Sequence, residues 1–139
     1  MEPYYSNSVS DTEQFACELA KSLHPGDVIA FTGGLGAGKT AFVRGLAKGL
    51  GVSGEVSSPT FSLVHEYAGA VPLYHFDMYR ITDLDDLYST GFFDYLESGG
   101  ILAIEWSENI QGVLPDHTIY IEIEPIGEEQ RKITIHRSL

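Results

Sequence analysis

Residues 33–40 read Gly33-Gly34-Leu35-Gly36-Ala37-Gly38-Lys39-Thr40, a complete G-x-x-x-x-G-K-T phosphate-binding loop. An apolar run over residues 28–31 precedes the loop and a helical pattern over residues 39–50 follows it, which is the strand–loop–helix context that the motif requires. In such a loop the backbone N–H groups surround the phosphates, and the positive end of the helix dipole faces the same anion. The stretch therefore predicts a nucleotide-binding site.

The side chains and the backbone of this loop have different expected parts in that site. We expect Lys39 to reach the β- and γ-phosphates and the Thr40 hydroxyl to bind Mg²⁺. The α- and β-phosphates are expected to lie in a backbone cradle formed by Gly33, Leu35, Gly36, Ala37 and Gly38.

The composition is that of a small acidic protein. At 139 residues the chain has the length of one domain, and 20 Asp and Glu residues against 8 Lys and Arg residues give a formal charge of −12. This charge disfavours direct binding of nucleic acid and of anionic membranes. The lone cysteine, Cys17, lies among apolar residues of a predicted helix, which favours a buried reduced thiol. With neither a leader-like N-terminus nor a long apolar run, the sequence predicts a cytoplasmic protein.

Hydrophobic periodicity predicts the remaining elements. A capping box at Ser10-Asp11-Thr12-Glu13 opens a helix from about Asp11 to Leu23, and Gly51 is suited to end the helix over residues 39–50. Residues 1–9 are expected to be loosely ordered ahead of a single domain. Strands are expected over residues 28–31 and 101–104, in a hairpin of 61–67 with 71–76, and in a terminal antiparallel pair of 118–124 with 131–137; helical turns are expected near 82–85 and 92–96.

Two carboxylates are candidates to act on the bound phosphates. A phosphate loop needs an acidic partner for Mg²⁺, usually at the end of an adjacent buried strand, and Glu105 closes the apolar run 101–104. Asp77 ends another predicted strand, two residues after His75, which taken alone is interpreted as a packed or surface histidine. Thr60 follows the loop helix and is a candidate sensor of the γ-phosphate, with a β-turn as the alternative interpretation of its segment.

Four motifs in this order resemble those of one family. After the Gly-x-Leu-Gly-Ala-Gly-Lys-Thr loop, three further motifs follow: Val56-Ser57-Ser58-Pro59-Thr60-Phe61, Tyr74-His75-Phe76-Asp77-Met78-Tyr79-Arg80 and Ile104-Glu105-Trp106. With these four motifs in this order, the chain resembles the TsaE family, also called YjeE. The resemblance implies a bacterial ATPase that binds ATP or ADP with Mg²⁺ and is required for threonylcarbamoyl modification of adenosine 37 in tRNA. It implies an α/β P-loop domain in which a mainly parallel central sheet gains antiparallel strands and flanking helices. It also implies an accessory role, in which ATP hydrolysis resets a complex of two related proteins, TsaB and TsaD.

The resemblance further implies roles for individual residues. Lys39 and Thr40 match the phosphate lysine and the magnesium threonine, and Glu105 matches the magnesium carboxylate. Asp77 matches an aspartate needed for hydrolysis, and Trp106 matches an aromatic residue needed for activity.

Two matches and one departure concern the rest of the nucleotide site. Thr12 matches a threonine near the nucleotide, and Arg131 matches a late basic residue near the base. Family members usually carry an acidic residue where this chain has Gly34, so any water-mediated role of that side chain is absent here.

Two other function classes compete with this interpretation. A small-molecule kinase of this size would hold two anionic ligands with several arginines, whereas only Arg44 and Arg80 lie in the middle of this chain. A nucleotide switch that does not hydrolyse would need less acidic chemistry than Asp77 and Glu105 provide, although a slow reset factor can fit both descriptions.

Overall fold

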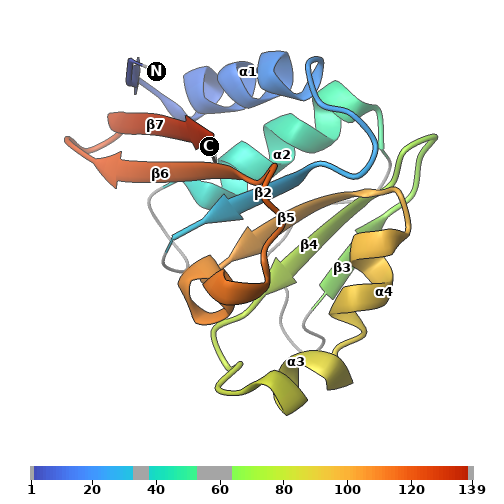
Figure 1. The fold of residues 1–139 in the computed structure, drawn as a ribbon. Coiled ribbons are helices and arrows are strands. Elements are labelled where there is room, and N and C mark those ends of the chain that lie inside the picture. The colour runs from blue at the N-terminus through green and yellow to red at the C-terminus, as the bar shows by residue number, and fades with distance from the viewer. Residues whose placement is uncertain (1, 33–37, 53–63, 138–139) are drawn as a thin grey trace.

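The computed structural model describes residues 2–32, 38–52 and 64–137. Within them the strands form one mixed sheet in the order β1-β7-β6-β2-β5-β4-β3, with helices on both faces (Figure 1). The strands are β1 (Tyr4–Ser6), β2 (Val28–Phe31), β3 (Val64–Tyr67), β4 (Leu73–Asp77), β5 (Ile101–Glu105), β6 (Ile119–Pro125) and β7 (Arg131–Arg137). The helices are α1 (Val9–Ala20), α2 (Lys39–Leu50), α3 (Leu84–Ser89) and α4 (Phe92–Glu97), and a 3₁₀ segment, η1 (Ser107–Val113), follows β5.

The centre of the sheet is parallel and its two sides are antiparallel. Strand β2 pairs in parallel with β5 and β6, and β4 pairs in parallel with β5. The antiparallel pairs are β3 with β4, β6 with β7 and β1 with β7. This arrangement confirms the expected α/β architecture, the terminal strand pair and the hairpin pairing of β3 with β4. Residues 61–63 of the predicted hairpin lie outside the described residues.

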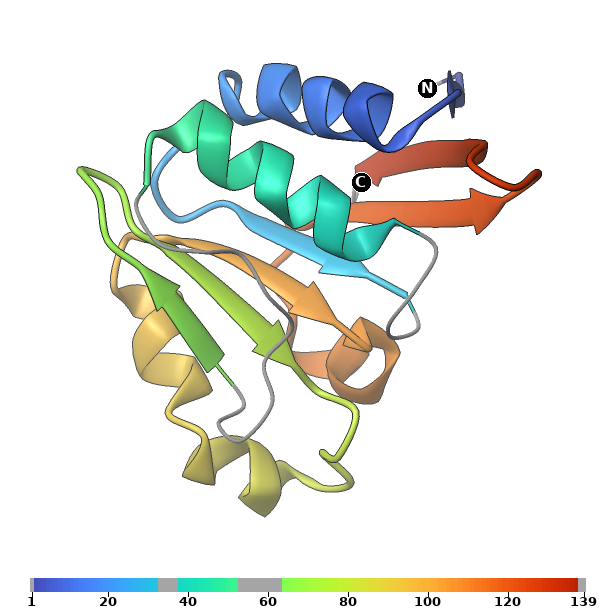
Figure 2. The ribbon, with the colours of Figure 1, turned by 180° about the vertical axis from the view of Figure 1, so that it is seen from behind.

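Two apolar layers cover the two faces of the sheet. Helices α1 and α2 pack on one face, over side chains such as Ile29 and Phe31, while α3, α4 and η1 pack on the other, over side chains such as Val28 and Leu102 (Figure 2). Strand β2 is buried along its whole length because it is covered on both sides, which explains its continuous apolar sequence.

Helices α1 and α2 approach closely through a small residue. A Cβ at Gly45 would lie 2.2 Å from the carbonyl oxygen of Glu13 and 2.7 Å from the Cβ of Ala16, so only glycine fits this position. At the rim of the same contact Arg44 donates to the Glu13 carboxylate at 2.6 Å. This packing fixes α2, which carries the predicted phosphate lysine at its first residue.

The start of the chain differs from the prediction. Helix α1 begins at Val9 rather than Asp11, because the Oγ of Ser8 accepts the backbone N–H of Asp11 and thus caps the helix two residues before the predicted Ser10 box. The helix also ends at Ala20, before Leu23. Instead of being loosely ordered, Tyr4–Ser6 form β1, whose antiparallel pairing with β7 ties the segment down.

The helices are short. The two longest, α1 and α2, have 12 residues each, whereas a membrane span needs about 20 apolar residues. Among the described residues, no helix is both long and apolar enough to cross a membrane.

Candidate functional site

The candidate site lies at the edge of the sheet where β2, β4 and β5 end, next to the first residues of α2 (Figure 1). Parallel strands present their carboxyl ends at a common edge, and ligands of open α/β sheets bind there. Gly38, which precedes α2, has a φ of 88°, a left-handed conformation that suits glycine. Gly33, Leu35, Gly36, Ala37 and Thr60, which the sequence also assigns to the site, lie outside the described residues.

Lys39 is more buried than a lysine on the protein surface usually is. Only 6% of the residue is exposed, which differs from the usual picture of a surface lysine. Burial lowers the pKa of its ammonium group, and the carboxylates of Glu105 and Glu108 partly oppose that shift. These carboxylates are therefore close enough to influence the lysine, although they lie on different elements. Thr40 follows at the second position of α2 and is half-buried.

Asp77 and Glu105 lie side by side at the ends of β4 and β5. The register of these parallel strands pairs Asp77 with Glu105 and His75 with Ala103. The side chains at all four positions therefore point to the same face of the sheet, which is the face that α2 covers. Asp77 is half-buried, and its Oδ1 accepts the backbone N–H of Tyr79 at 3.0 Å.

Glu105 is held by a buried histidine. His75 is fully buried, Glu105 is 2% exposed, and the distance from His75 Nε2 to Glu105 Oε2 is 2.8 Å. Because an ionised carboxylate can only accept hydrogen bonds, the histidine donates from Nε2. Of the two sequence interpretations of His75, packed or surface, the structure excludes the second, and the first is incomplete because His75 contacts a candidate metal ligand.

The second oxygen of Glu105 has no hydrogen-bond partner among the described residues. The same is true of Nδ1 of His75, and both atoms are buried. Leaving a buried polar group unsatisfied costs about 1–3 kcal/mol, so such an atom calls for a ligand, an ion or a water. A carboxylate oxygen in this position fits a divalent cation.

The described residues do not form an all-protein metal cage. They contain no group of three or more His, Cys, Asp or Glu side chains arranged to hold a metal ion. Mg²⁺ is usually bound through one or two carboxylates together with waters and substrate phosphates, so a site for it does not need three such side chains.

Trp106 has an unusual backbone conformation at the end of β5. Its φ is 59°, and it is the only described non-glycine residue with a positive φ. Its side chain packs against the apolar layer of α3, α4 and η1, on the opposite face from Glu105, and its ring centroid lies 5.0 Å from that of the exposed Tyr79. A bulky residue with positive φ is strained, and such strain concentrates at functional sites.

A cavity of about 250 Å³ lies beside the start of α2. It is lined by the first turn of α1, by α2 and by the β6–β7 connection, and its lining includes Thr12, Gly38 and Arg131. The hydroxyls of Ser6 and Thr12 are 2.7 Å apart, and since Ser6 donates to the carbonyl of Ser8, Thr12 is the donor of this pair. Thr12 can therefore offer a cavity ligand only its oxygen lone pairs. The guanidinium of Arg131 donates to carbonyls of the β6–β7 turn, the shortest at 2.8 Å to Gln130.

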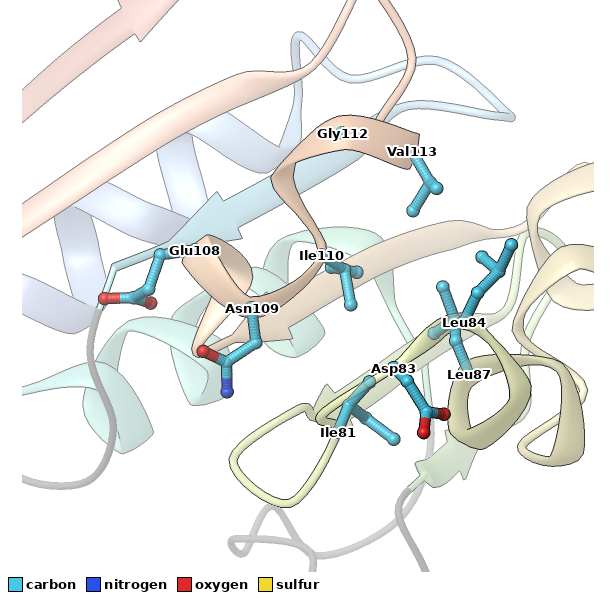
Figure 3. Close-up of a pocket in the computed structure, with 9 residues that line it drawn as sticks. All are labelled: Ile81, Asp83, Leu84, Leu87, Glu108, Asn109, Ile110, Gly112 and Val113. Atoms are coloured by element: carbon cyan, nitrogen blue, oxygen red, sulfur yellow. The ribbon is translucent and has the colours of Figure 1, made fainter.

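A second pocket, of about 260 Å³, lies between α3 and η1 (Figure 3). Its floor is apolar, with Ile81, Leu87 and Ile110, and its described lining carries two carboxylates, Asp83 and Glu108, and no basic side chain. It is therefore unsuited to phosphate. Glu108 lies at the end of the row of lining residues, and its side chain points away from α3.

The structure adds His75 and Glu108 to the candidate site. The signal for His75 is its spacing from Asp77, since residues two apart on a strand share a face. Glu108 follows Glu105 by three residues, and its carboxylate opposes the lowering of the Lys39 pKa, but nothing in the sequence predicts the η1 segment that carries it.

Comparisons with known proteins identify a family and a solved structure that this chain resembles. The family described as "Threonylcarbamoyl adenosine biosynthesis protein TsaE" matches residues 6–133. The chain is 38% identical over 130 residues to "tRNA threonylcarbamoyladenosine biosynthesis protein TsaE" of Treponema pallidum, covering 94% of this chain and 96% of that protein. It is 40% identical over 125 residues to the Bacillus subtilis protein of the same name, covering 89% and 78%.

A solved structure shares the fold. The crystal structure of Bacillus subtilis YdiB superposes with a TM-score of 0.80 at 34% identity, over 99% of this chain and 85% of that chain. The protein is thus a mixed α/β protein with candidate ligand groups at the carboxyl edge of its sheet. The chain belongs to the TsaE family.

Proposed function

We propose that this chain is a Mg²⁺-dependent P-loop ATPase that acts as an accessory protein in the biosynthesis of threonylcarbamoyladenosine at position 37 of tRNA. Its ATP hydrolysis resets a partner complex of the TsaB–TsaD type. The observation that carries the proposal is the meeting of Lys39, Asp77 and Glu105 at one edge of the sheet, where α2 begins and β4 and β5 end. Family membership supports the pathway.

Lys39 and the start of α2 bind the phosphates in this proposal. Burial disfavours the charged form of Lys39 in the free protein, and an adjacent phosphate anion would favour that form again. The N–H groups at the start of the helix add donors and a positive partial charge. The site therefore offers a cation and helix N–H donors to a phosphate anion.

Glu105 and Thr40 are the residues that would hold Mg²⁺. The buried Glu105 oxygen that lacks a hydrogen-bond partner supports this assignment. The chemistry that Mg²⁺ would supply there is positive charge against the phosphates, which would stabilise the charge that develops during phosphoryl transfer.

Asp77 acts on the attacking water. Its Oδ1 is engaged by the N–H of Tyr79, which leaves Oδ2 to orient a water or accept its proton, and its partial exposure lets water reach it. Glu105, its neighbour in the register, is buried and is thus better suited to a fixed ligand role.

The cavity beside Gly38 receives the nucleoside. Thr12 and Arg131 line it at the start of α2, and the lone pairs of Thr12 match the exocyclic amino donor of adenine. This arrangement supports the family-implied positions of both residues.

The biological assignment is tested by co-purification with the TsaB and TsaD proteins of the same cell. We expect association that depends on whether ATP, ADP or no nucleotide is present, because a reset factor must bind its partner differently in different nucleotide states. Absence of association in every nucleotide state contradicts the partner assignment and leaves the ATPase proposal standing.

Glu105→Gln is expected to remove most of the effect of Mg²⁺ on nucleotide binding. The amide keeps the shape and can still accept from His75, but it loses the charge that attracts the cation. We expect the affinity gained on adding Mg²⁺ to fall at least about tenfold. Calorimetric titration of ADP with and without Mg²⁺ measures this, and Glu122→Gln, an exposed carboxylate on β6, is the matched control. Equal ADP affinity with and without Mg²⁺ in the unmodified protein would contradict the metal site.

Trp106 fluorescence is expected to report nucleotide. The indole directly follows Glu105 and contacts Tyr79, which follows Asp77 by two residues, so a ligand at either carboxylate disturbs its surroundings. We expect Mg²⁺–ADP to change the emission of this single tryptophan and the change to shrink in Glu105→Gln. Trp106→Phe should fold and show reduced partner-stimulated hydrolysis. An emission spectrum that saturating Mg²⁺–ADP leaves unchanged would disprove the coupling.

A further inference from the structure

His75 occupies a position that packing alone would give to an apolar side chain. On its strand and its face, Leu73 belongs to the apolar layer beneath α2, as do Ile101 and Ala103 on the neighbouring β5. His75 is fully buried among them, and its Nδ1 has no hydrogen-bond partner within the part of the chain that the structure describes. A buried imidazole with one unsatisfied nitrogen is a poor core residue, so its role lies in the bond that it does make.

That bond fixes one oxygen of Glu105 and leaves the other free. Ala103 stands opposite His75 in the register, and its small side chain leaves room for the imidazole to reach Glu105, two residues further along β5. Nε2 of His75 holds Oε2 at 2.8 Å, while Oε1 is buried with no hydrogen-bond partner among the described residues. The carboxylate thus has one anchored oxygen and one oxygen available to a cation.

A hydrogen bond that already orients a metal ligand lowers the conformational entropy that the ligand loses when it binds the cation. A carboxylate that is free to rotate loses conformational freedom when it binds a cation, whereas an anchored carboxylate has already lost it. Groups that hold metal ligands in this way typically contribute a factor of about 10–100 to metal affinity.

We propose that His75 is a positioning residue, which orients Glu105 so that Oε1 faces the bound cation, and that it thereby sets the Mg²⁺ affinity of the nucleotide complex. This inference rests on the proposed function, because it takes Glu105 as the magnesium carboxylate. In this proposal His75 acts through Glu105 and not directly on the nucleotide or the metal.

The test measures the Mg²⁺ concentration at which ADP binding is half-enhanced, together with ADP affinity in the presence of EDTA. In His75→Leu we expect the Mg²⁺ midpoint to rise about tenfold or more, with ADP affinity in EDTA changed by less than about twofold. His75→Gln should restore most of the loss, because the side-chain N–H of glutamine can donate from the place of Nε2.

Leu102→Ala is the control for a purely structural effect. Leu102 lies on the opposite face of β5, so its loss lowers the melting temperature without touching Glu105. We expect its Mg²⁺ midpoint to equal that of the unmodified protein. If His75→Leu does not fold, His75→Asn takes its place, because the shorter amide does not reach Oε2.

Two results overturn the inference and leave the proposed metal site standing. One is a Mg²⁺ midpoint in folded His75→Leu or His75→Asn that differs by less than about twofold from that of the unmodified protein, because the inference expects a rise of about tenfold or more. The other is an equal loss of ADP affinity with and without Mg²⁺, which indicates a structural role. If the unmodified protein itself binds ADP equally with and without Mg²⁺, the proposed metal site fails and the inference fails with it. Failure of the proposed metal site is therefore seen in the unmodified protein, whereas failure of the inference alone is seen only in the His75 variants.

Discussion

Lys39→Ala is expected to reduce ATP hydrolysis by at least about a hundredfold, since a positioned cation on the transferring phosphate is among the largest electrostatic contributions to such reactions. The domain should stay folded. Alanine is a better helix former than lysine, and the substitution removes a side chain whose charged form burial disfavours. Phosphate release and the melting temperature, measured on the same preparation, check both expectations.

The matched control for this variant is Lys48→Ala. Lys48 lies in the last turn of the same helix and is exposed, so its replacement changes the same net charge away from the site. We expect unchanged hydrolysis in Lys48→Ala. Hydrolysis at the normal rate in Lys39→Ala would remove the phosphate loop from the mechanism.

Asp77→Asn is expected to retain ATP binding and to lose hydrolysis. The asparagine oxygen can still accept the N–H of Tyr79, so the local turn is kept, but an amide cannot accept a proton from water. General-base catalysis contributes a factor of about 10²–10⁴, and we expect a loss in that range with ATP affinity changed by less than a factor of about three. Equilibrium ATP binding and single-turnover hydrolysis separate the two effects.

Asp85→Asn is the control, because it makes the same change on the exposed first turn of α3.

A further consequence is that Asp77→Asn should trap the partner complex in its ATP-bound form. An Asp77→Asn protein that hydrolyses ATP normally would show that the site assignment at Asp77 is wrong.

Much of the fold follows from local sequence signals. Strand β2 and helix α2 match their predicted bounds, because a continuous apolar run defines the strand and Gly51, with a φ of 69°, ends the helix. Strands β6 and β7 are predicted because isoleucines alternate along both of them. Strand β1 escapes prediction since three residues carry no period, and its stability comes from pairing with β7 at the far end of the chain.

The candidate site likewise has a part that the sequence predicts and a part that it does not. The positions of Glu105 and Asp77 at the ends of strands are predictable, because each directly follows a segment that the sequence predicts as a strand. The bond between His75 and Glu105 is not predictable, because it joins residues 30 apart and depends on the register of β4 with β5. The positive φ of Trp106 is likewise not predictable, because no local sequence signal indicates it.

The central claim is that this protein hydrolyses ATP to act on a partner, and single-turnover phosphate release tests it most directly. The unmodified protein in excess over ATP, with Mg²⁺ and without any alcohol acceptor, is followed alone and with the TsaB and TsaD proteins. We predict slow release of inorganic phosphate from the protein alone, faster release with the partners, and none above background in Lys39→Ala. No release even with the partners would contradict the account and indicate a switch without hydrolysis, and phosphate transfer that requires an added alcohol would indicate a kinase.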